Sequence, residues 1–533
     1  MAFRTRKRST VPTAIGAAAI VVALIAGCSS GKPNSSGSAG SNAPAGSKTL
    51  TIDKAFDLKT ADPARMYEPT GEMLDKALYQ TLLTFNGGDV SQVVPGLATL
   101  DQSADAKTFT LTLRGAPVFS DGTPLTADDV VFSLQRVIGV KGNPSFLLDG
   151  VTIAKTDDKT VVLTTKTPTP ALPAILANPA LGIVNSKVVK ANGGTTDTTD
   201  AAEHYLNTQS AGSGPYILSS LNLASEVVLT ANPKYTGTAP AYSRVVIQNV
   251  QSATQKINVQ GGSADIALDL SGTQASGLSS GINVTSGPSA NVIFLLLNQD
   301  TSVSPITANP DFVKAVKEAL DYSDLVTLAG KGTLQAAGIV PSMLLGALGT
   351  GDALTQDVAA AKADLAKSGY NGQNIDLDFP NDITLNGLEF PLLAQRIQYQ
   401  LKAVGINTTL GPAPVATELD KYRNGKEPIG LWYWGPDYPD PSDYLVFAPG
   451  DVVGLRAGWA ADAAPSITQL AATAAAGGTN EQRQTQFADF QKAMNESGPF
   501  VPLLQPGNNI AARSGVSGIV YNPVWTIDIA LLK

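Results

Sequence analysis

Hydrophobic and polar residues alternate in several short segments of the chain, which predicts β-strands. In residues 48–53 and 107–114, leucine, isoleucine or phenylalanine occupies every second position, and mostly threonine lies between. This period of two places the apolar side chains on one face of a strand. We expect residues 48–53 to form an edge strand, and residues 151–154 and 161–165 to form a hairpin closed around an Asp-Asp-Lys turn.

Apolar residues spaced three and four positions apart predict helices. Residues 70–85 carry such a stripe, formed by Met73, Leu74, Ala77, Leu78 and Leu82. A second helix is expected to begin at Thr126-Ala-Asp-Asp129, where the threonine and the second aspartate are spaced as in a capping box. Residues 479–497 form a further predicted helix, and residues 500–504 a strand after it.

The C-terminal half contains a βαβ pattern. A strand over residues 375–379 is followed by a helical stripe over residues 388–404, by Gly405 as a helix stop, and by a strand over residues 406–410. Such a unit implies a parallel sheet with a right-handed crossover. Residues 429–434 are predicted to form a further strand.

Residues 431–445, LWYWGPDYPDPSDYL, concentrate aromatic and acidic side chains at the end of this last strand. Aromatic rings stack on flat or apolar ligand groups, and a carboxylate among them can bind a cation. Ligands of open α/β sheets bind beyond the carboxyl ends of strands, so the position favours a ligand site. The alternative is a tight turn, because Gly-Pro and Asp-Pro pairs break regular structure.

The composition is that of a globular protein of two or three domains. Of the 533 residues, 43% are hydrophobic and only 15% are charged. The net charge is −8, and without the four cations of its amino terminus the chain has 33 cations against 45 anions. The acidic balance and the lack of a basic patch give no reason to expect nucleic acid as a partner.

The amino terminus has the organisation of a secretory signal peptide. An apolar run over residues 11–26, short for a permanent membrane span, follows the basic residues Arg4, Arg6, Lys7 and Arg8. We therefore expect residues 1–27 to be a signal peptide that is removed from the mature protein.

Cys28 follows this run directly and is the only cysteine of the chain, which excludes an intrachain disulfide. Residues 25–28, IAGC, resemble a bacterial lipobox, and this resemblance implies cleavage before the cysteine and lipidation of its thiol. Residues 28–47 are rich in small and polar side chains and are expected to be a lipidated, flexible tether. The protein would then be anchored at the outer face of the bacterial cytoplasmic membrane.

Residues 111–137, LTLRGAPVFSDGTPLTADDVVFSLQRV, resemble the signature of the family 5 extracellular solute-binding proteins of ABC importers, the oligopeptide-, dipeptide- and nickel-binding group. Further segments resemble motifs of the same family in the same order: residues 212–216 (GSGPY), 232–237 (NPKYTG), 294–298 (FLLLN), 313–339 and 357–370. The resemblance extends over residues 48–533, effectively the whole mature chain.

This resemblance implies an α/β, two-lobed periplasmic-binding-protein fold, with a hinge between the lobes and a subdomain inserted in the first lobe. The implied parts are residues 48–66, 185–285 and 505–533 for lobe I, residues 67–184 for the insert, and residues 286–504 for lobe II. The chain would cross between the lobes near residues 286–292 and 503–507.

The ligand-binding aspartate of the family lies in the pattern Trp-x-x-Asp-Tyr, which Trp434, Asp437 and Tyr438 match. In peptide-binding members it pairs with the amino-terminal ammonium of the ligand, so the resemblance implies this role for Asp437. Capping of the following turn is the alternative role. Some members place an arginine three residues before the tryptophan, where it meets the ligand's carboxylate, but this chain has Leu431 there. The length of the ligand, and whether it is a peptide, therefore stay open.

Three further residues are candidates for the ligand site. Trp432 and Trp434 would point to the same face of a regular strand, so one of them is expected to lie in the core. Tyr67 and Glu68 belong to a loop that faces the cleft in the family. The later aspartates of the stretch, Asp440 and Asp443, are expected to be turn residues.

An enzyme is the competing class of protein. His204 is the only histidine, so a two-histidine metal site is impossible. Residues 277–281, GLSSG, match the nucleophile-elbow pattern, but that fold needs a histidine after Ser279 and none follows. No Walker A, GxGxxG or CxxC pattern occurs, so we predict no catalytic residue, no metal and no cofactor.

These observations together predict a lipid-anchored, monomeric substrate-binding component of an ABC importer. It would bind short peptides between two lobes and deliver them to permease and ATPase subunits. Two alternatives stay open: the same fold with a non-peptide solute (a metal chelate, haem or an oligosaccharide), and a binding-fold lipoprotein that acts as a sensor or adhesin.

Overall fold

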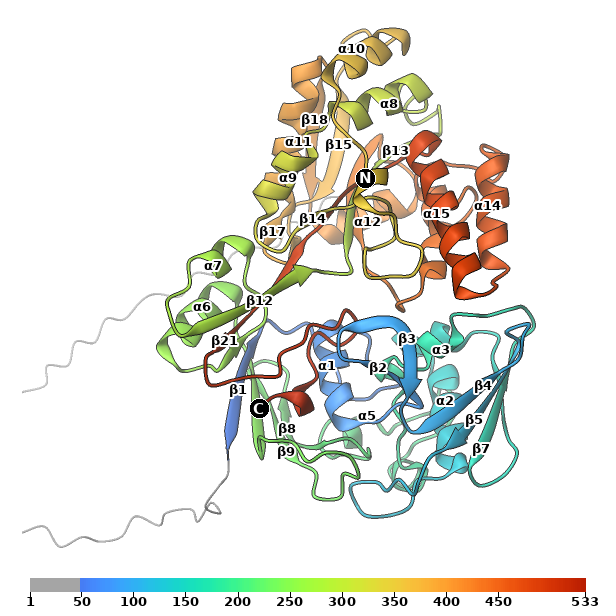
Figure 1. Ribbon diagram of the computed structural model, residues 1–533, viewed down its shortest axis with the longest axis vertical. Helices are drawn as coiled ribbons and strands as arrows, with labels where there is room; N and C mark the ends of the chain where they lie inside the picture. Colours follow the sequence, from blue (N-terminus) through green and yellow to red (C-terminus); the bar gives the residue numbers. More distant parts are fainter. Residues whose placement is uncertain (1–47) are drawn as a thin grey trace, which may run out of the picture. The chain divides into compact units, whose positions relative to one another are not determined.

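The computed structural model describes residues 48–533, and two large sheets organise this region (Figure 1). The first has seven strands in the order β12 (Ile282–Pro288), β21 (Gly507–Arg513), β11 (Ile266–Ala267), β1 (Thr49–Lys54), β10 (Arg244–Asn249), β9 (Glu226–Ala231) and β8 (Tyr216–Asn222). Segments from both ends of the described chain therefore meet in one sheet.

Strand β1 lies in the middle of this sheet and not at its edge. It runs parallel to β10 on one side and to β11 on the other, and its Leu50 and Ile52 are fully buried. The prediction of an edge strand is therefore wrong. The alternation of apolar and polar residues reports that one face packs on a core, which a central strand can show as well as an edge strand.

The second sheet has six strands in the order β14 (Leu334–Gln335), β20 (Phe500–Gln505), β13 (Val292–Leu297), β19 (Ile429–Trp434), β15 (Ile375–Pro380) and β18 (Thr408–Ala413). Strand β13, VIFLLL, is buried along its whole length. Ile293 and Leu295 belong to one core, whereas Phe294 and Leu296 belong to another. The sheet thus separates two cores, which explains the continuous apolar run of its central strand.

The predicted βαβ unit is confirmed. Strands β15 and β18 are parallel, and the helix between them, α11 (Phe390–Val404), has a proline in its first turn and ends at Gly405 with φ 102°. Strand β19 is also parallel to β15. Its carboxyl end therefore points to the same edge of the sheet as that of β15.

Two connections link the sheets and lie side by side. Strand β12 of the first sheet leads into β13 of the second, and β20 of the second leads into β21 of the first. The pairs β12–β21 and β13–β20 are both antiparallel, and between them the Ser289 amide donates to the Pro506 carbonyl at 2.9 Å. Figure 1 shows β12 and β21 beside α6 and α7.

The segment between the first helix and β8 has a sheet of its own, in the order β4 (Ala98–Gln102), β5 (Thr108–Leu113), β7 (Thr160–Thr164) and β6 (Thr152–Lys155). Strand β5 and the hairpin β6–β7 are the predicted elements. Helix α2 (Ala127–Val140) begins with the predicted capping box of Thr126 and Asp129 and ends at Lys141, which has φ 58°. These three sequence predictions are confirmed.

Helix α1 (Pro69–Leu78) ends seven residues before the predicted boundary at residue 85. The chain becomes extended at Tyr79 and enters β2 (Leu83–Asn86), which pairs with β3 (Asp89–Pro95). The Leu82 carbonyl accepts hydrogen bonds from Gly96 and Ala98 instead of from a helical amide. Leu82 is nevertheless buried, like the apolar residues of the helix. Its apolar character therefore fitted the predicted helical stripe, although the helix ends before it.

The remaining helices connect and cover these sheets. They are α3 (Leu172–Ile175), α4 (Ser186–Ala191), α5 (Glu203–Leu206), α6 (Ser252–Gly261), α7 (Gly272–Ser276), α8 (Pro310–Ala319), α9 (Tyr322–Ala329), α10 (Val358–Lys367), α12 (Val415–Arg423), α13 (Val452–Arg456), α14 (Pro465–Ala475) and α15 (Asn480–Ser497). Short 3-10 helices are η1 (Asn143–Leu148), η2 (Pro179–Leu181), η3 (Thr350–Asp352), η4 (Pro441–Phe447) and η5 (Ile529–Leu531), and β16 (Thr384–Leu385) pairs with β17 (Leu388–Glu389). The predicted helix over residues 479–497 is α15, and the predicted strand after it is β20.

Candidate functional site

The loop after β19 carries Asp437 to the point where the two sheets are connected. Val292 at the start of β13 pairs with Trp434 at the end of β19, so residues 289–291 lie opposite residues 435–437. A Cβ atom at Gly435 would lie 2.4 Å from the Asn291 Oδ1 atom, so the glycine lets the Asn291 side chain approach the backbone closely. The two chain segments are thus held together where the ladder ends.

A cavity of about 930 Å³ opens at this point. Its wall is built from several places in the chain, among them the residues after β1, the start of α1, the residues around the starts of α6 and α7, the residues before β13, the β16–β17 hairpin, the loop after β19 and residues 521–526. Its polar wall includes Asp57, Tyr67, Glu72, Ser289, Asn291 and Asp437. This volume is in the range of small-molecule sites, and its wall comes from both large sheets.

Tyr67 and Asp437 meet inside the cavity. The Tyr67 hydroxyl donates to the Asp437 Oδ1 atom at 2.8 Å, and it lies 3.3 Å from the Asp437 carbonyl oxygen. Burial raises the pKa of Asp437, although the hydrogen bond from Tyr67 opposes the shift. Burial and the nearby charge of Asp437 raise the pKa of Tyr67 as well, so the phenol stays a donor. Within residues 48–533, no lysine, arginine or histidine forms an ion pair with Asp437.

Trp434 and Tyr438 support the loop from outside the cavity wall. The Trp434 Nε1 atom donates to the Asp443 Oδ2 atom at 2.9 Å, and the Asp437 amide donates to the same oxygen at 3.3 Å. Burial, followed by the charge of Asp437, raises the pKa of Asp443 to about 8. Burial also raises the pKa of Tyr438. Asp443 therefore fixes the loop from behind, which is more than the turn role expected from the sequence.

Trp432 and Glu68 are buried beside the site and do not line the cavity. Trp432 stacks on Tyr422 with ring centroids 4.4 Å apart, and its Nε1 atom donates to both carboxylate oxygens of Glu427 at 3.0 and 2.8 Å. The Glu68 Oε2 atom accepts a hydrogen bond from the Tyr67 amide at 3.1 Å. Trp432 is thus a core tryptophan, and Glu68 holds the backbone next to Tyr67.

The structure brings residues to the cavity that the sequence did not identify. Tyr433 lies on the opposite strand face from Trp432 and Trp434 and lines the cavity. Asp57 follows β1 as Asp437 follows β19, so the rule that ligands bind beyond strand ends could have found it. Glu72, in the first turn of α1, had no such signal.

Comparison with known proteins shows to which family the chain belongs. A model of the bacterial extracellular solute-binding proteins, family 5, which describes their middle region, matches residues 92–451, about two thirds of the chain. The chain belongs to this family. The family resemblance of the sequence motifs is thereby confirmed.

Relatives of this solute-binding protein match it over most of their length. The probable D,D-dipeptide-binding periplasmic protein DdpA of Escherichia coli is 29% identical over 89% of this chain and 92% of its own length. Di/tripeptide-binding protein 2 of Pseudomonas aeruginosa is 25% identical over 91% of this chain and 95% of its own.

A solved structure shows the same fold. The ABC transporter substrate-binding protein CtaP of Listeria monocytogenes superposes with a TM-score of 0.79 at 20% identity, over 91% of this chain and 99% of its own. The predicted two-lobed α/β fold is therefore confirmed, and family and fold are those of solute-binding proteins and not of enzymes.

Two structural observations complete the description of residues 48–533. None of the helices there combines the length and the apolar character that a membrane span requires. No three histidine, cysteine, aspartate or glutamate side chains of this part lie close enough together to hold a metal ion.

Proposed function

We propose that this solute-binding protein captures short peptides in the cavity, with Asp437 as the acceptor for the ligand's amino-terminal ammonium, and delivers them to the permease of an ABC importer. One observation carries the proposal: Asp437 is half-buried in the cavity wall, and its described partners are the Tyr67 hydroxyl and no cation. A ligand ammonium would supply the missing charge.

The energetics favour a cationic group at this place. Burial raises the pKa of Asp437, which means that the empty site penalises the ionised carboxylate. A charged partner with good geometry offsets that penalty. The two relatives described above are named as dipeptide- and di/tripeptide-binding proteins, which supports a ligand with an ammonium end.

The other residues of the site are assigned supporting roles. Tyr67 orients the Asp437 carboxylate, and Trp434 and Tyr438 hold the loop that carries it. Trp432 and Glu68 would act on the site only through their neighbours, since neither lines the cavity.

Asp437→Asn is expected to weaken binding of a tripeptide with a free amino terminus much more than binding of its N-acetylated form. Removing one partner of a buried charge pair costs about 2 kcal/mol or more, or roughly 30-fold in the dissociation constant. Isothermal titration calorimetry with trialanine and N-acetyl-trialanine measures both. Asp462→Asn, at an exposed aspartate that does not line the cavity, is the matched control. Equal losses for the two peptides would remove Asp437 from this role.

The division into lobes is part of the proposal. Residues 48–66, 185–285 and 505–533 would form lobe I, residues 67–184 its insert, and residues 286–504 lobe II, with the crossovers as the hinge. The division is supported by the two connections that run side by side between the sheets. Tyr67 of the insert and Asp437 of lobe II already contact each other at 2.8 Å, so opening about the hinge would separate them and admit the ligand.

The lipid anchor is also proposed, and it rests on the sequence alone. The signal peptide of residues 1–27, the tether of residues 28–47 and the lipidation of Cys28 all lie outside the described residues. A lipidated tether would keep a monomeric binding protein close to its permease at the outer face of the cytoplasmic membrane.

Cys28→Ala in the full-length chain is expected to release the protein from bacterial membranes. The change removes the acylation site and leaves the folded part intact. Fractionation of cells, followed by extraction with a detergent that partitions lipoproteins, measures the result. Cys28→Ser is a second variant that keeps the size of the side chain, and firm retention of both variants in the membrane fraction would refute the anchor.

A further inference from the structure

The charges of the cavity wall are strongly unbalanced. Five carboxylates line it, those of Asp57, Glu72, Asp269, Glu389 and Asp437, and among the described residues Lys54 is the only cation of this wall. The Lys54 Nζ atom lies 2.6 Å from the Asp269 Oδ1 atom, so this pair neutralises itself. The other four carboxylates of the described wall form no ion pair, although the charge of Lys54 also acts on Asp57.

One of these carboxylates, Glu72, lies close to both Asp57 and Asp437. The Asp57 Oδ1 atom accepts a hydrogen bond from the Thr70 amide at 3.0 Å, at the start of α1, and Glu72 follows in the first turn of that helix. Burial, and then the charges of Asp57 and Asp437, raise the pKa of Glu72 to about 8, although a hydrogen bond from the Asn178 amide group opposes the shift. Glu72 is therefore mostly protonated at neutral pH in the empty cavity, and a cationic ligand group beside it would favour its ionised form.

A second, independent observation concerns Ser289, which lines the cavity. The residue is only 2% exposed, and its Oγ atom has no hydrogen-bond partner among the described residues. Ser289 lies opposite the loop that carries Asp437. Buried polar atoms are normally paired, so a ligand group is the natural partner of this hydroxyl.

The opposite end of a peptide finds no cation here. Leu431, which replaces the arginine of some family members, is fully buried in the core below β19. Lys54 is already paired with Asp269. A free carboxylate in this cavity would therefore face mainly negative charge, which is unfavourable at short range.

From these observations we infer that the cavity selects cationic peptides, with a lysine or arginine side chain close to the amino terminus. Asp437 accepts the amino-terminal ammonium, as proposed above, and the inference rests on that function. Asp57 and Glu72 accept the second cation, and Ser289 hydrogen-bonds the peptide backbone between them. The carboxyl end of the peptide makes no ion pair with the wall.

The first test needs no variant. Calorimetric titration with Lys-Ala-Ala, Leu-Ala-Ala and Glu-Ala-Ala, each also as its C-terminal amide, compares peptides of one length. Lys-Ala-Ala is expected to bind roughly 100-fold more tightly than Glu-Ala-Ala, because like charges repel in a site of low dielectric. Amidation is expected to leave the dissociation constant of each peptide the same or lower.

The outcomes separate the two proposals. If Lys-Ala-Ala and Glu-Ala-Ala bind with equal affinity, or if amidation abolishes binding, the cationic selection is wrong while peptide binding stands. If none of the peptides binds, the proposed peptide function itself fails.

Glu72→Gln and Asp57→Asn then locate the second cation site. Each is expected to reduce the ratio of affinities for Lys-Ala-Ala and Leu-Ala-Ala by roughly tenfold, whereas Glu496→Gln, on the exposed last turn of α15, keeps the ratio. Circular dichroism checks that the variants are folded. An unchanged ratio in both cavity variants would place the second cation elsewhere and overturn the assignment.

Discussion

Arg136→Met is expected to lower the free energy of unfolding by about 3–5 kcal/mol, because it removes the buried cation of an ionic network and leaves Asp62 and Asp200 with only the partly exposed Arg65 as a counter-charge. The Arg136 side chain is 2% exposed. Its guanidinium contacts both oxygens of Asp62 at 2.6 Å and both oxygens of Asp200 at 2.8 Å. Two bidentate pairs share one arginine, a geometry that lysine cannot reproduce.

The network ties three distant segments together. Asp62 lies between β1 and α1, Arg136 on α2 and Asp200 before α5. Burial alone would raise the pKa of Asp200, but the hydrogen bonds and charge of Arg136 outweigh burial, so its pKa is lowered. The same two aspartates raise the pKa of Arg136 against the effect of burial. Arg136 and Asp200 thus stabilise each other's ionised form.

Denaturant unfolding of the purified protein, followed by tryptophan fluorescence, measures the loss. Arg423→Met, at an exposed arginine on α12, is the matched control and is expected to change the unfolding free energy by less than about 0.5 kcal/mol. Arg136→Lys keeps one charge and should be intermediate. A change below about 1 kcal/mol for Arg136→Met would show that the buried aspartates find other partners.

The position of Arg136 explains what the family signature over residues 111–137 could and could not reveal. The segment supplies the capping box of α2, and Asp121 accepts a hydrogen bond from Asn185 at 3.0 Å. Arg136 supplies the buried network. These residues build the fold, so their pattern identifies the family, but none of them lines the cavity and they say nothing about the ligand.

Local sequence patterns predicted helices and strands correctly where the preference of the segment itself agrees with its contacts in the folded protein. The βαβ unit was predictable because α11 carries its own start and stop signals and both strands are apolar. The end of helix α1 was not predictable, since the Leu78 carbonyl accepts a hydrogen bond from Gly214, and the Thr81 and Leu82 carbonyls accept hydrogen bonds from residues 96–98, which no local pattern indicates. The central place of β1 depends on β10 and β11, roughly two hundred residues away in the chain.

The site was predictable only in part, and for the same reason. Asp437 and Tyr67 could be proposed because motifs mark their segments, and the structure places them 2.8 Å apart although 370 residues separate them. Glu72 and Ser289 carry no motif. They line the same cavity only because α1 and the chain before β13 lie close together in the folded protein. Their role in the site therefore follows from the tertiary structure alone.

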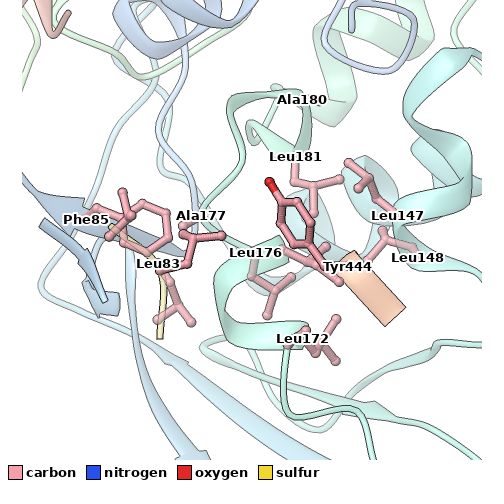
Figure 2. Close-up of a cluster of buried hydrophobic side chains, with 14 of the residues drawn as sticks. Leu83, Phe85, Leu147, Leu148, Leu172, Leu176, Ala177, Ala180, Leu181 and Tyr444 are labelled. Atoms are coloured by element: carbon pink, nitrogen blue, oxygen red, sulfur yellow. The ribbon is translucent and has the colours of Figure 1, made fainter. Parts of the chain in front are cut away.

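Tyr444→Ala is the second change with a large expected effect. Tyr444 lies seven residues after Asp437, in η4, and is fully buried. Figure 2 shows its ring among side chains from η1, α3, η2 and the residues between α3 and η2, namely Leu147, Leu148, Leu172, Leu176, Ala177, Ala180 and Leu181. Its hydroxyl lies 3.4 Å from the Ala290 carbonyl oxygen, next to the first crossover. One ring thus joins the segment behind Asp437 to the segment that carries the four-stranded sheet.

Loss of this ring is expected to lower the unfolding free energy by about 3–5 kcal/mol, because a large buried aromatic side chain is replaced by a cavity. The contact also joins the segments that we propose as lobe II and the insert of lobe I, so its loss should favour a more open arrangement. Small-angle X-ray scattering of the ligand-free protein should give a larger radius of gyration, and peptide affinity should fall.

Tyr444→Phe separates packing from hydrogen bonding. The phenylalanine keeps the ring and loses only a long hydroxyl contact, so the unfolding free energy, the radius of gyration and the peptide affinity should stay close to those of the unchanged protein. If Tyr444→Ala lowers stability while the radius of gyration and the affinity stay unchanged, the ring is a packing residue only. If both variants increase the radius of gyration equally, the hydroxyl contact with Ala290, and not the packing of the ring, holds the proposed lobe II against the insert.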